Sequence, residues 1–173
     1  RISIAKLGNT RTPLAYAQVS SELLTLEGVD IATFNLSSIV QSLGTTTGSP
    51  NVSRVDLCVD FITDYPLDKI TESDWVTKAK EMHRHIVQRQ FSGWSIGTRK
   101  KMSARLYDKT LEMKKNPRPY LEHLWRKSGW DGVQPVWRLE FELRRDLLRE
   151  FGIISIDDLK EHLAGLWKYS TYD

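Results

Sequence analysis

Tyr107 lies between two cations, Arg105 and Lys109, each two residues away along the chain. Alternate side chains of a β-strand point to the same face, so a strand here would place the phenol between both cations. Nearby cations favour the phenolate form of a tyrosine, and they also attract phosphate. Tyr107 is therefore a candidate nucleophile toward an anionic substrate. The alternative is an exposed strand tyrosine that packs among long side chains.

Two other segments repeat this spacing with an acid in place of the phenol. Arg54 stands two residues before Asp56, and Arg138 stands two residues before Glu140. If the strands are neighbours, four acids gather on one face: Asp56, Asp60, Glu140 and Glu142. Crowded carboxylates repel unless a cation joins them, and oxygen ligands favour Mg²⁺, Mn²⁺ or Ca²⁺. The alternative is a set of cross-strand Arg–carboxylate pairs, which need no metal.

The positive charge of the chain is concentrated in one segment. Residues 97–127 carry ten Lys and Arg against three Asp and Glu, a net charge of +7, whereas the rest has a net charge of −4. This distribution predicts a surface for a polyanion, although a solvated Lys-rich helix and loop would have the same composition. Arg99, Lys100 and Lys101 form a basic hairpin loop that would hold a DNA backbone, and Trp94 beside it would stack on a base.

A pair of histidines, His83 and His85, is a further candidate, because two histidines around one residue on a strand mark a large class of nicking enzymes. The intervening residue here is Arg84, and apolar spacing from Val76 to Val87 predicts a helix after a capping box at residues 71–74. Residues two apart on a helix point about 200° apart. We therefore expect no metal site at this pair.

The elements that must position these residues follow from apolar periodicity. We expect strands at residues 2–7, 16–24, 54–61, 90–97, 102–107 and 133–145. We expect helices at residues 32–43, 71–87, 120–127, 146–151 and 155–167. Several strands are polar on one side only. The fold class is therefore α+β: an antiparallel sheet with helices packed on one face and a polar catalytic face open to a ligand.

Length and composition fit one domain over residues 1–173, with 40% apolar and 27% charged residues. The single cysteine, Cys58, suits a reducing cytoplasm. No apolar run approaches the roughly 20 residues of a membrane helix, and no signal peptide is visible. We therefore predict a cytoplasmic protein without a membrane partner. The chain begins at Arg1 rather than Met, which is what a fragment of a longer protein would show.

Four short motifs resemble, in order and rough spacing, the replication initiation factor family. They are residues 54–60 (RVDLCVD), 96–99 (IGTR), 105–109 (RLYDK) and 138–140 (RLE). This family comprises rolling-circle initiators of plasmids and filamentous phages, with relatives among the relaxases of conjugative elements. The resemblance spans roughly residues 50–167, and residues 1–50 match weakly. It implies an enzyme that nicks single-stranded DNA, or an extruded origin hairpin, and keeps the 5′ phosphate on a tyrosine.

Carried over by position, the resemblance makes Tyr107 the nucleophile. Asp56 and Glu140 would bind a Mg²⁺ or Mn²⁺ ion, with Asp60 and Glu142 as the neighbours that could replace either. Charge on the phosphoryl oxygens would be offset by Lys109, Arg105 and Arg138. A bacterial host would supply a helicase or polymerase as a further partner.

Two other functions remain open from the sequence. A non-catalytic nucleic-acid-binding domain could keep the sheet and the basic loop without the chemistry. A structural or protein-interaction domain of the same fold class is the third interpretation. Acids beside Tyr107 favour the enzyme over the binding domain, because a binding domain gains nothing from carboxylates that repel phosphates. Salt-dependent DNA binding would separate the second interpretation from the third.

Overall fold

The computed structural model describes residues 1–5, 15–45, 48–98 and 100–172. Contacts between Cα atoms divide the chain into two compact units, Arg1–Pro50 and Asn51–Asp173. The sequence predicted a single domain whose first fifty residues match the resemblance weakly. The boundary between the units coincides with the end of that weakly matching part.

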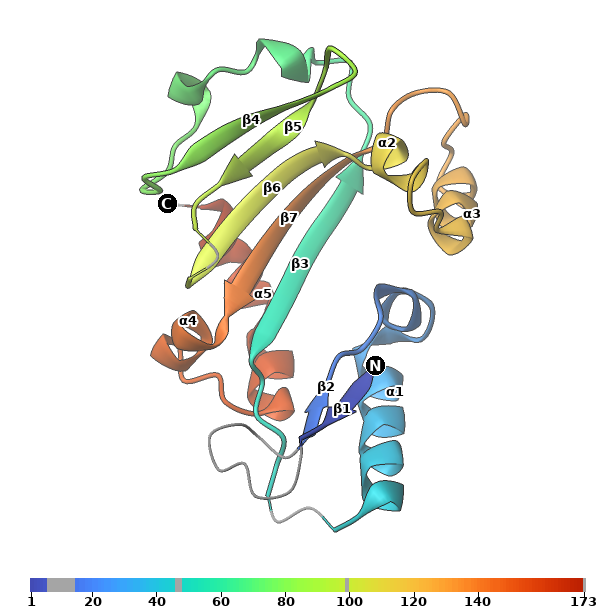
Figure 1. Cartoon of the computed structure of the whole chain (residues 1–173), viewed down its shortest axis with the longest axis vertical. Coiled ribbons are helices and arrows are strands. Elements are labelled where there is room, and N and C mark those ends of the chain that lie inside the picture. Colours follow the sequence, from blue (N-terminus) through green and yellow to red (C-terminus); the bar gives the residue numbers. More distant parts are fainter. Residues whose placement is uncertain (6–14, 46–47, 99, 173) are drawn as a thin grey trace. The chain divides into compact units, whose positions relative to one another are not determined.

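The first unit pairs two short antiparallel strands and adds one helix (Figure 1). β1 (Ile2–Ile4) pairs with β2 (Ala15–Ala17), and α1 spans Ser21–Leu43. The predicted strand over residues 16–24 is wrong beyond Ala17, because the Ser20 hydroxyl accepts a hydrogen bond from the amide of Leu23 and starts the helix there. Gly28, with a φ of 81°, kinks α1 within its span.

Helix α1 is apolar and mostly exposed. An 18-residue window within it has a mean hydropathy of 1.3, so it is the one helix of the described residues long and apolar enough to cross a membrane. The sequence analysis expected no such segment. Buried helices of soluble proteins and signal sequences share these properties, but only 6% of this window is buried. Its exposed large side chains are Leu24, Leu26, Ile31, Phe34, Ile39 and Leu43.

The second unit is built on a five-stranded antiparallel sheet with strand order β3-β7-β6-β5-β4. Its strands are β3 (Arg54–Phe61), β4 (Met82–Val87), β5 (Gln90–Ile96), β6 (Met102–Asp108) and β7 (Trp137–Arg144). Figure 1 shows the last strand in sequence, β7, lying between β3 and β6. The predicted α+β class with an antiparallel sheet is confirmed.

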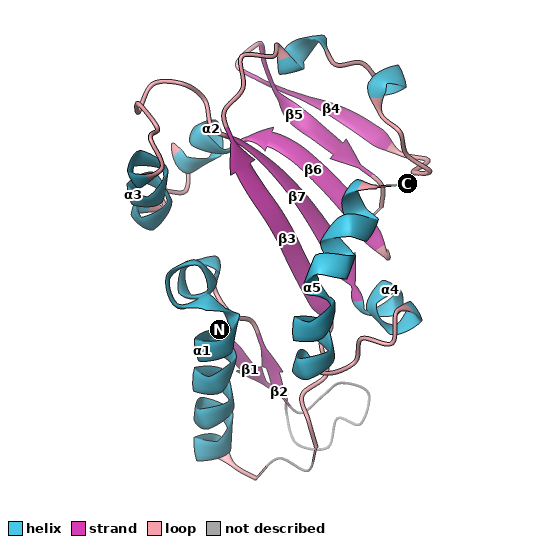
Figure 2. Ribbon diagram, turned by 180° about the vertical axis from the view of Figure 1, so that it is seen from behind, coloured by secondary structure: helices cyan, strands magenta, loops and turns pink. Residues whose placement is uncertain are grey.

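Helices and loops cover the apolar face of this sheet. α4 (Arg145–Glu150) and α5 (Ile156–Thr171) pack there, and Figure 2 shows α5 crossing the sheet. Ser155 caps α5 with Asp158 in the predicted capping box. The core beneath these helices includes Leu143, Leu148, Leu159 and Leu166. A second cluster joins Trp94, Leu106 and Trp137 to the loop that carries the 3₁₀ turns η1 (Leu67–Lys69) and η2 (Glu72–Asp74).

Two short helices follow β6 at one end of the sheet. α2 (Lys109–Met113) begins where Asp108 accepts a hydrogen bond from the amide of Leu111, 2.8 Å away. α3 (Pro119–Lys127) begins with a proline at its first position, as the sequence predicted. Leu121, Trp125 and Val136 form a third small core under α3.

The predicted helix over residues 71–87 is wrong. The capping box at Thr71 exists, but it caps only the single 3₁₀ turn η2. The chain then forms strand β4 instead of a helix. The strand ends at Gln88 and Arg89, which adopt left-handed conformations with φ of 50° and 65° and turn the chain back. These two residues form a tight hairpin turn that pairs Val87 with Gln90. The helix-like spacing of apolar residues was therefore misleading.

Candidate active site on the polar face of the sheet

Strand register brings the predicted motifs together on one face of β3, β7 and β6. Arg138 of β7 is paired with Asp60 of β3 on one side and with Tyr107 of β6 on the other. In the next row of the same face, Glu140 lies opposite Arg105. The expectation that these three strands are neighbours is confirmed.

The hydroxyl of Tyr107 donates a hydrogen bond to Oε2 of Glu140 over 3.1 Å. The other oxygen of Glu140 is ion-paired with the guanidinium of Arg105. Arg105 and Lys109 lie over the phenol ring, 5.8 and 5.6 Å from its centroid. Lys109 is buried and is paired with Glu112 over 2.6 Å. The phenol is thus held between two cations and a carboxylate that accepts its hydrogen bond.

The pKa of Tyr107 is raised well above its usual value. Burial is the main cause, because a phenolate loses solvation there, and the negative charge of Glu140 is the next. Arg138 and Arg105 oppose this shift but do not reverse it. The flanking cations favour the phenolate, as the sequence suggested, but burial and the charge of Glu140 together outweigh them and favour the protonated phenol.

Asp60 holds Arg138, which lies between Asp60 and Tyr107 on the neighbouring strands. The guanidinium donates two hydrogen bonds to the carboxylate, of 2.6 and 2.8 Å, and Nε1 of Trp125 donates a third over 2.9 Å. Burial alone would lower the pKa of Arg138, but its hydrogen bonds to Asp60 and the charge of Asp60 raise it. Arg138 is thus a fixed, charged group beside Tyr107.

The remaining two predicted ligands are also paired with arginines. Arg54 donates two hydrogen bonds to Asp56, of 2.7 and 2.5 Å. Glu142 is 3.2 Å from Arg54 and accepts a hydrogen bond of 2.7 Å from Arg144. Glu142 is only 3% exposed, so its negative charge is compensated by these two arginines rather than by water.

As arranged, the four carboxylates do not fit a divalent metal. Each of Asp56, Asp60, Glu140 and Glu142 already holds at least one guanidinium, which a metal ion would have to displace. No group of three His, Cys, Asp or Glu side chains in the described part of the chain is placed to bind one ion. The arrangement matches the alternative of Arg–carboxylate pairs. Metal dependence stays a prediction, and no step below depends on it.

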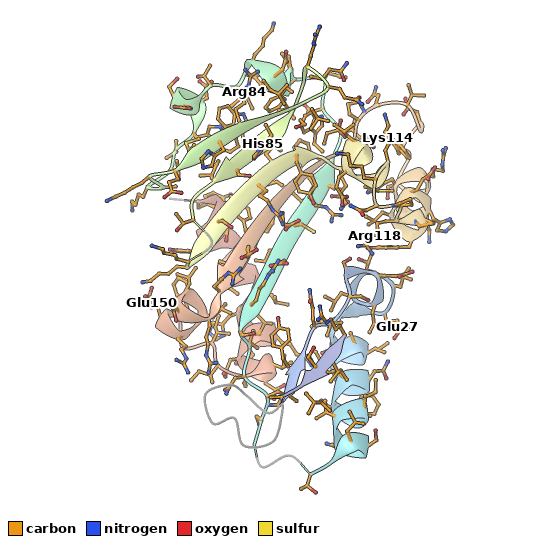
Figure 3. All side chains as sticks on the ribbon, viewed as in Figure 1. Glu27, Arg84, His85, Lys114, Arg118 and Glu150 are labelled. Carbon is orange, nitrogen blue, oxygen red and sulfur yellow. The ribbon has the colours of Figure 1, made fainter. Side chains whose placement is uncertain are left out.

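The reason for excluding the two histidines is also corrected. On strand β4, His83 and His85 point to one face, and Figure 3 labels His85 there. His85 pairs with Gly93 of β5, which pairs with Tyr107 of β6. A Cβ at Gly93 would lie 2.1 Å from the carbonyl oxygen of Leu106. Only glycine therefore fits at this position between His85 and Tyr107. His85 shares a hydrogen bond of 2.7 Å with the hydroxyl of Ser95.

These residues line a cavity of about 510 Å³ beside the phenol. Its polar lining comes from His85, Ser95, Arg105, Tyr107, Glu112 and Lys115. Sequence reasoning did not place His85, Ser95 or Lys115 in the site. The sequence analysis did not identify the turn at residues 88–89. Because of this turn, His85 lies on strand β4 on the side of the tyrosine rather than on a helix.

The predicted DNA-binding residues have mixed outcomes. The hairpin loop between β5 and β6 is present, with Lys100 exposed and Lys101 ion-paired with Glu150, while Arg99 lies outside the described residues. Trp94 stays a prediction as a stacking residue. It is 2% exposed and packs against Trp75 and Phe91, and it is also among the residues that line the cavity beside Tyr107.

Comparison of the chain with protein-family models, with curated proteins and with solved structures finds no match. The chemistry of the site therefore rests on its own geometry. A tyrosine hydroxyl that donates to an acid, which is itself paired with an arginine, is the kind of geometry sought in a nucleophile–base pair.

Proposed function

We propose that the chain nicks and rejoins single-stranded DNA by transesterification, with Tyr107 as the nucleophile. The observation that carries the proposal is the hydrogen bond from the Tyr107 hydroxyl to Glu140, whose other oxygen is paired with Arg105. A buried structural tyrosine also needs an acceptor for its hydroxyl, but here that acceptor is a carboxylate that is itself held by Arg105. The cavity beside it is large enough for a phosphodiester and its flanking sugars.

In this reaction Glu140 acts as the proton acceptor. As the oxygen of Tyr107 forms a bond to phosphorus, its proton passes to Oε2 of Glu140, and the bond from phosphorus to the 3′ oxygen breaks. The 3′ oxygen takes up a proton from water. The products are a 5′ phosphate on Tyr107 and a free 3′ hydroxyl. The reverse reaction rejoins the strand without a nucleotide cofactor, because the phosphotyrosine bond keeps the energy of the phosphodiester.

Cations around the cavity offset the charge on the phosphoryl oxygens. Arg105 and Lys115 line the cavity directly, and His85 adds a donor from the opposite strand. Arg138 keeps a fixed positive charge beside the phenol. Such groups stabilise a transition state when they are held in place before the substrate binds. This role extends the one that the sequence predicted for Arg105, Lys109 and Arg138.

The biological setting proposed here follows the resemblance to replication initiation factors. The substrate would be single-stranded DNA or an extruded origin hairpin, in the cytoplasm of a bacterial host that supplies a helicase or polymerase. The predicted Mg²⁺ or Mn²⁺ ion belongs to this setting, although the paired carboxylates give it no ready ligands. The test below therefore includes both a metal and a chelator.

The direct test is a covalent adduct on a denaturing gel. The protein is incubated with a labelled single-stranded oligonucleotide, with Mn²⁺ in one arm and EDTA in the other. We expect a labelled protein band that Tyr107→Phe abolishes and that the exposed control Tyr65→Phe leaves unchanged. An adduct on the Tyr107→Phe variant would assign the chemistry to another residue. An adduct in EDTA would show that the cations of the site suffice without a metal.

A second function is supported by one observation. Every predicted metal ligand is ion-paired with an arginine. This pairing suits a nucleic-acid-binding sheet that performs no chemistry. This alternative predicts salt-dependent DNA binding without any adduct in either arm of the same experiment.

A further inference from the structure

A second cavity, of about 400 Å³, lies between α2, α3 and the loop that precedes β7. It is separate from the cavity beside Tyr107, and the two have no lining residue in common. Its main lining residues are Met113, Lys114, Arg118, Trp125, Trp130 and Val133. This size matches a site for one small ligand.

The charges at this cavity are available to a ligand. Lys114 and Arg118, which stand at the end of α2 and the start of α3, form no ion pair with any carboxylate in the described ranges (Figure 3). The one acid in the lining, Glu122, is engaged with Arg126 at 3.0 Å. The cavity therefore presents two free cations to an anion.

The cavity also has a rigid aromatic wall. The rings of Trp125 and Trp130 meet edge to face with their centroids 5.4 Å apart. Trp130 donates a hydrogen bond of 2.8 Å to the carbonyl oxygen of Gln134, and the guanidinium of Arg126 lies 5.3 Å from its ring centroid. Trp125 is only 9% exposed, so the partly exposed ring of Trp130, backed by Trp125, provides the surface for a nucleobase. Stacking on an indole ring is tolerant of sequence.

One wall residue connects this cavity to the candidate active site. Trp125 lines the cavity and donates a hydrogen bond to Asp60, the carboxylate that holds Arg138 next to Tyr107. A ligand that contacts Trp125 therefore touches a residue that is hydrogen-bonded to Asp60. Asp60 in turn holds Arg138 beside Tyr107. A strand that occupies both cavities would be held on both sides of its reacting phosphate.

We propose that the cavity between α2 and α3 binds one nucleotide of the DNA strand, with its base against the tryptophans and its phosphate on Lys114 and Arg118. The identity of the strand rests on the proposed function, but the binding itself needs no chemistry at Tyr107. The site would fix the position of the strand relative to the nucleophile.

Val133 offers a test that avoids the core, because it lines the cavity and is 85% exposed. In a Tyr107→Phe background, the affinity for a fluorescent oligothymidylate is measured by anisotropy for Val133→Asp and Val133→Lys. The acid should repel the phosphate and the lysine should attract it. We expect the two dissociation constants to differ by about tenfold or more at low salt.

A second pair of variants tests the cations. Lys114→Ala with Arg118→Ala should weaken binding by about tenfold. The control, Lys127→Ala, removes one exposed charge from the same helix outside the cavity and should weaken it much less. Thermal melts check that all variants fold. If both Val133 variants bind alike, or the double variant binds like the control, the proposal is overturned.

These outcomes are distinct from failure of the proposed function. Should the wild type form no adduct while the cavity variants still weaken binding, the nicking reaction fails and the nucleotide site stands. Should the wild type form an adduct while the cavity variants bind normally, the nucleotide site fails and the reaction stands.

Discussion

The two cavities of the second unit differ in how their charges are compensated. On the polar face of the sheet, Arg105, Lys109 and Arg138 each have an acidic partner within the protein, and only Lys115 among the cations described around Tyr107 has no ion pair in the described residues. Between α2 and α3, Lys114 and Arg118 have none among the described residues. Internal partners fix the geometry of a site before a ligand arrives, whereas free cations gain a partner only from the ligand. The first arrangement suits chemistry and the second suits binding.

This contrast predicts opposite costs for losing a charge. A charge removed from a buried pair leaves its partner uncompensated, and the fold is destabilised. A charge removed from a free cation leaves no such partner, so only ligand affinity changes. Three measurements in order of expected effect test this contrast.

The largest effect is expected for Asp60→Asn, which leaves Arg138 charged and buried. The side chains of this pair are 16% and 10% exposed, whereas those of Asp56 and Arg54 are 37% and 35% exposed. Breaking a buried pair costs about 3–5 kcal/mol of unfolding free energy, and an exposed pair about 0–1 kcal/mol. Urea unfolding of Asp60→Asn and Asp56→Asn should show this difference.

The same two variants test the metal ligands when melts are recorded in EDTA and in Mn²⁺. If Mn²⁺ stabilises the wild type but neither variant, the acids bind the ion and the arginine pairs are displaced by it. If Mn²⁺ changes all three melting temperatures equally, these two acids are not ligands.

A smaller effect is expected in the titration of Tyr107. The phenolate absorbance of the wild type minus that of Tyr107→Phe isolates this residue, and its pKa should lie above the usual value of about 10. Glu140→Gln should lower that pKa, because the charge of Glu140 is its second cause after burial. An unchanged titration in Glu140→Gln would contradict the hydrogen-bonded pair.

The sign of the linked stability follows from the raised pKa. The unfolded chain releases the proton of Tyr107 near pH 10, before the folded chain does. The contribution of Tyr107 to stability is therefore complete below about pH 10 and is lost as the pH rises toward its folded pKa. Tyr107→Phe should remove this part of the alkaline destabilisation.

The smallest effect is expected in the basic loop, whose cations are compensated to different degrees. Lys101 is paired with Glu150, and Lys100 is exposed. Neutralising Arg99, Lys100 and Lys101 together should weaken binding to all sequences and flatten the salt dependence, by about 0.7 in log–log slope per lost phosphate contact. Unchanged affinity for unrelated DNA would identify an ordinary solvated loop.

The sequence predicted those elements whose local pattern, such as strand alternation or a helix cap, agrees with the packing around them. Strand β3 was correct because its polar and apolar residues alternate without interruption, and α5 was correct because Ser155 and Asp158 form a capping box. Strand β4 was missed because its turn uses Gln88 and Arg89, which rarely adopt positive φ.

Within the site, the sequence predicted which residues gather. It did not predict which group pairs with each acid. The register of β3, β7 and β6 was implied by repeated spacing, so the gathering of Tyr107, Arg138 and Glu140 was predictable. The choice between metal and arginine as the partner of each acid depends on side-chain reach across strands, which one strand's sequence does not contain. The burial of Trp94 likewise depends on the loop that covers it.

The position of β7 between β3 and β6 has a consequence for biosynthesis. Strands β4, β5 and β6 follow one another and can pair as soon as they leave the ribosome, but β3 must wait for β7, made more than 70 residues later. Until then the chain has neither Arg138 nor Glu140, and the edge of β3 is unpaired. A nascent or truncated chain therefore lacks the complete candidate site, and it exposes an aggregation-prone strand to chaperones.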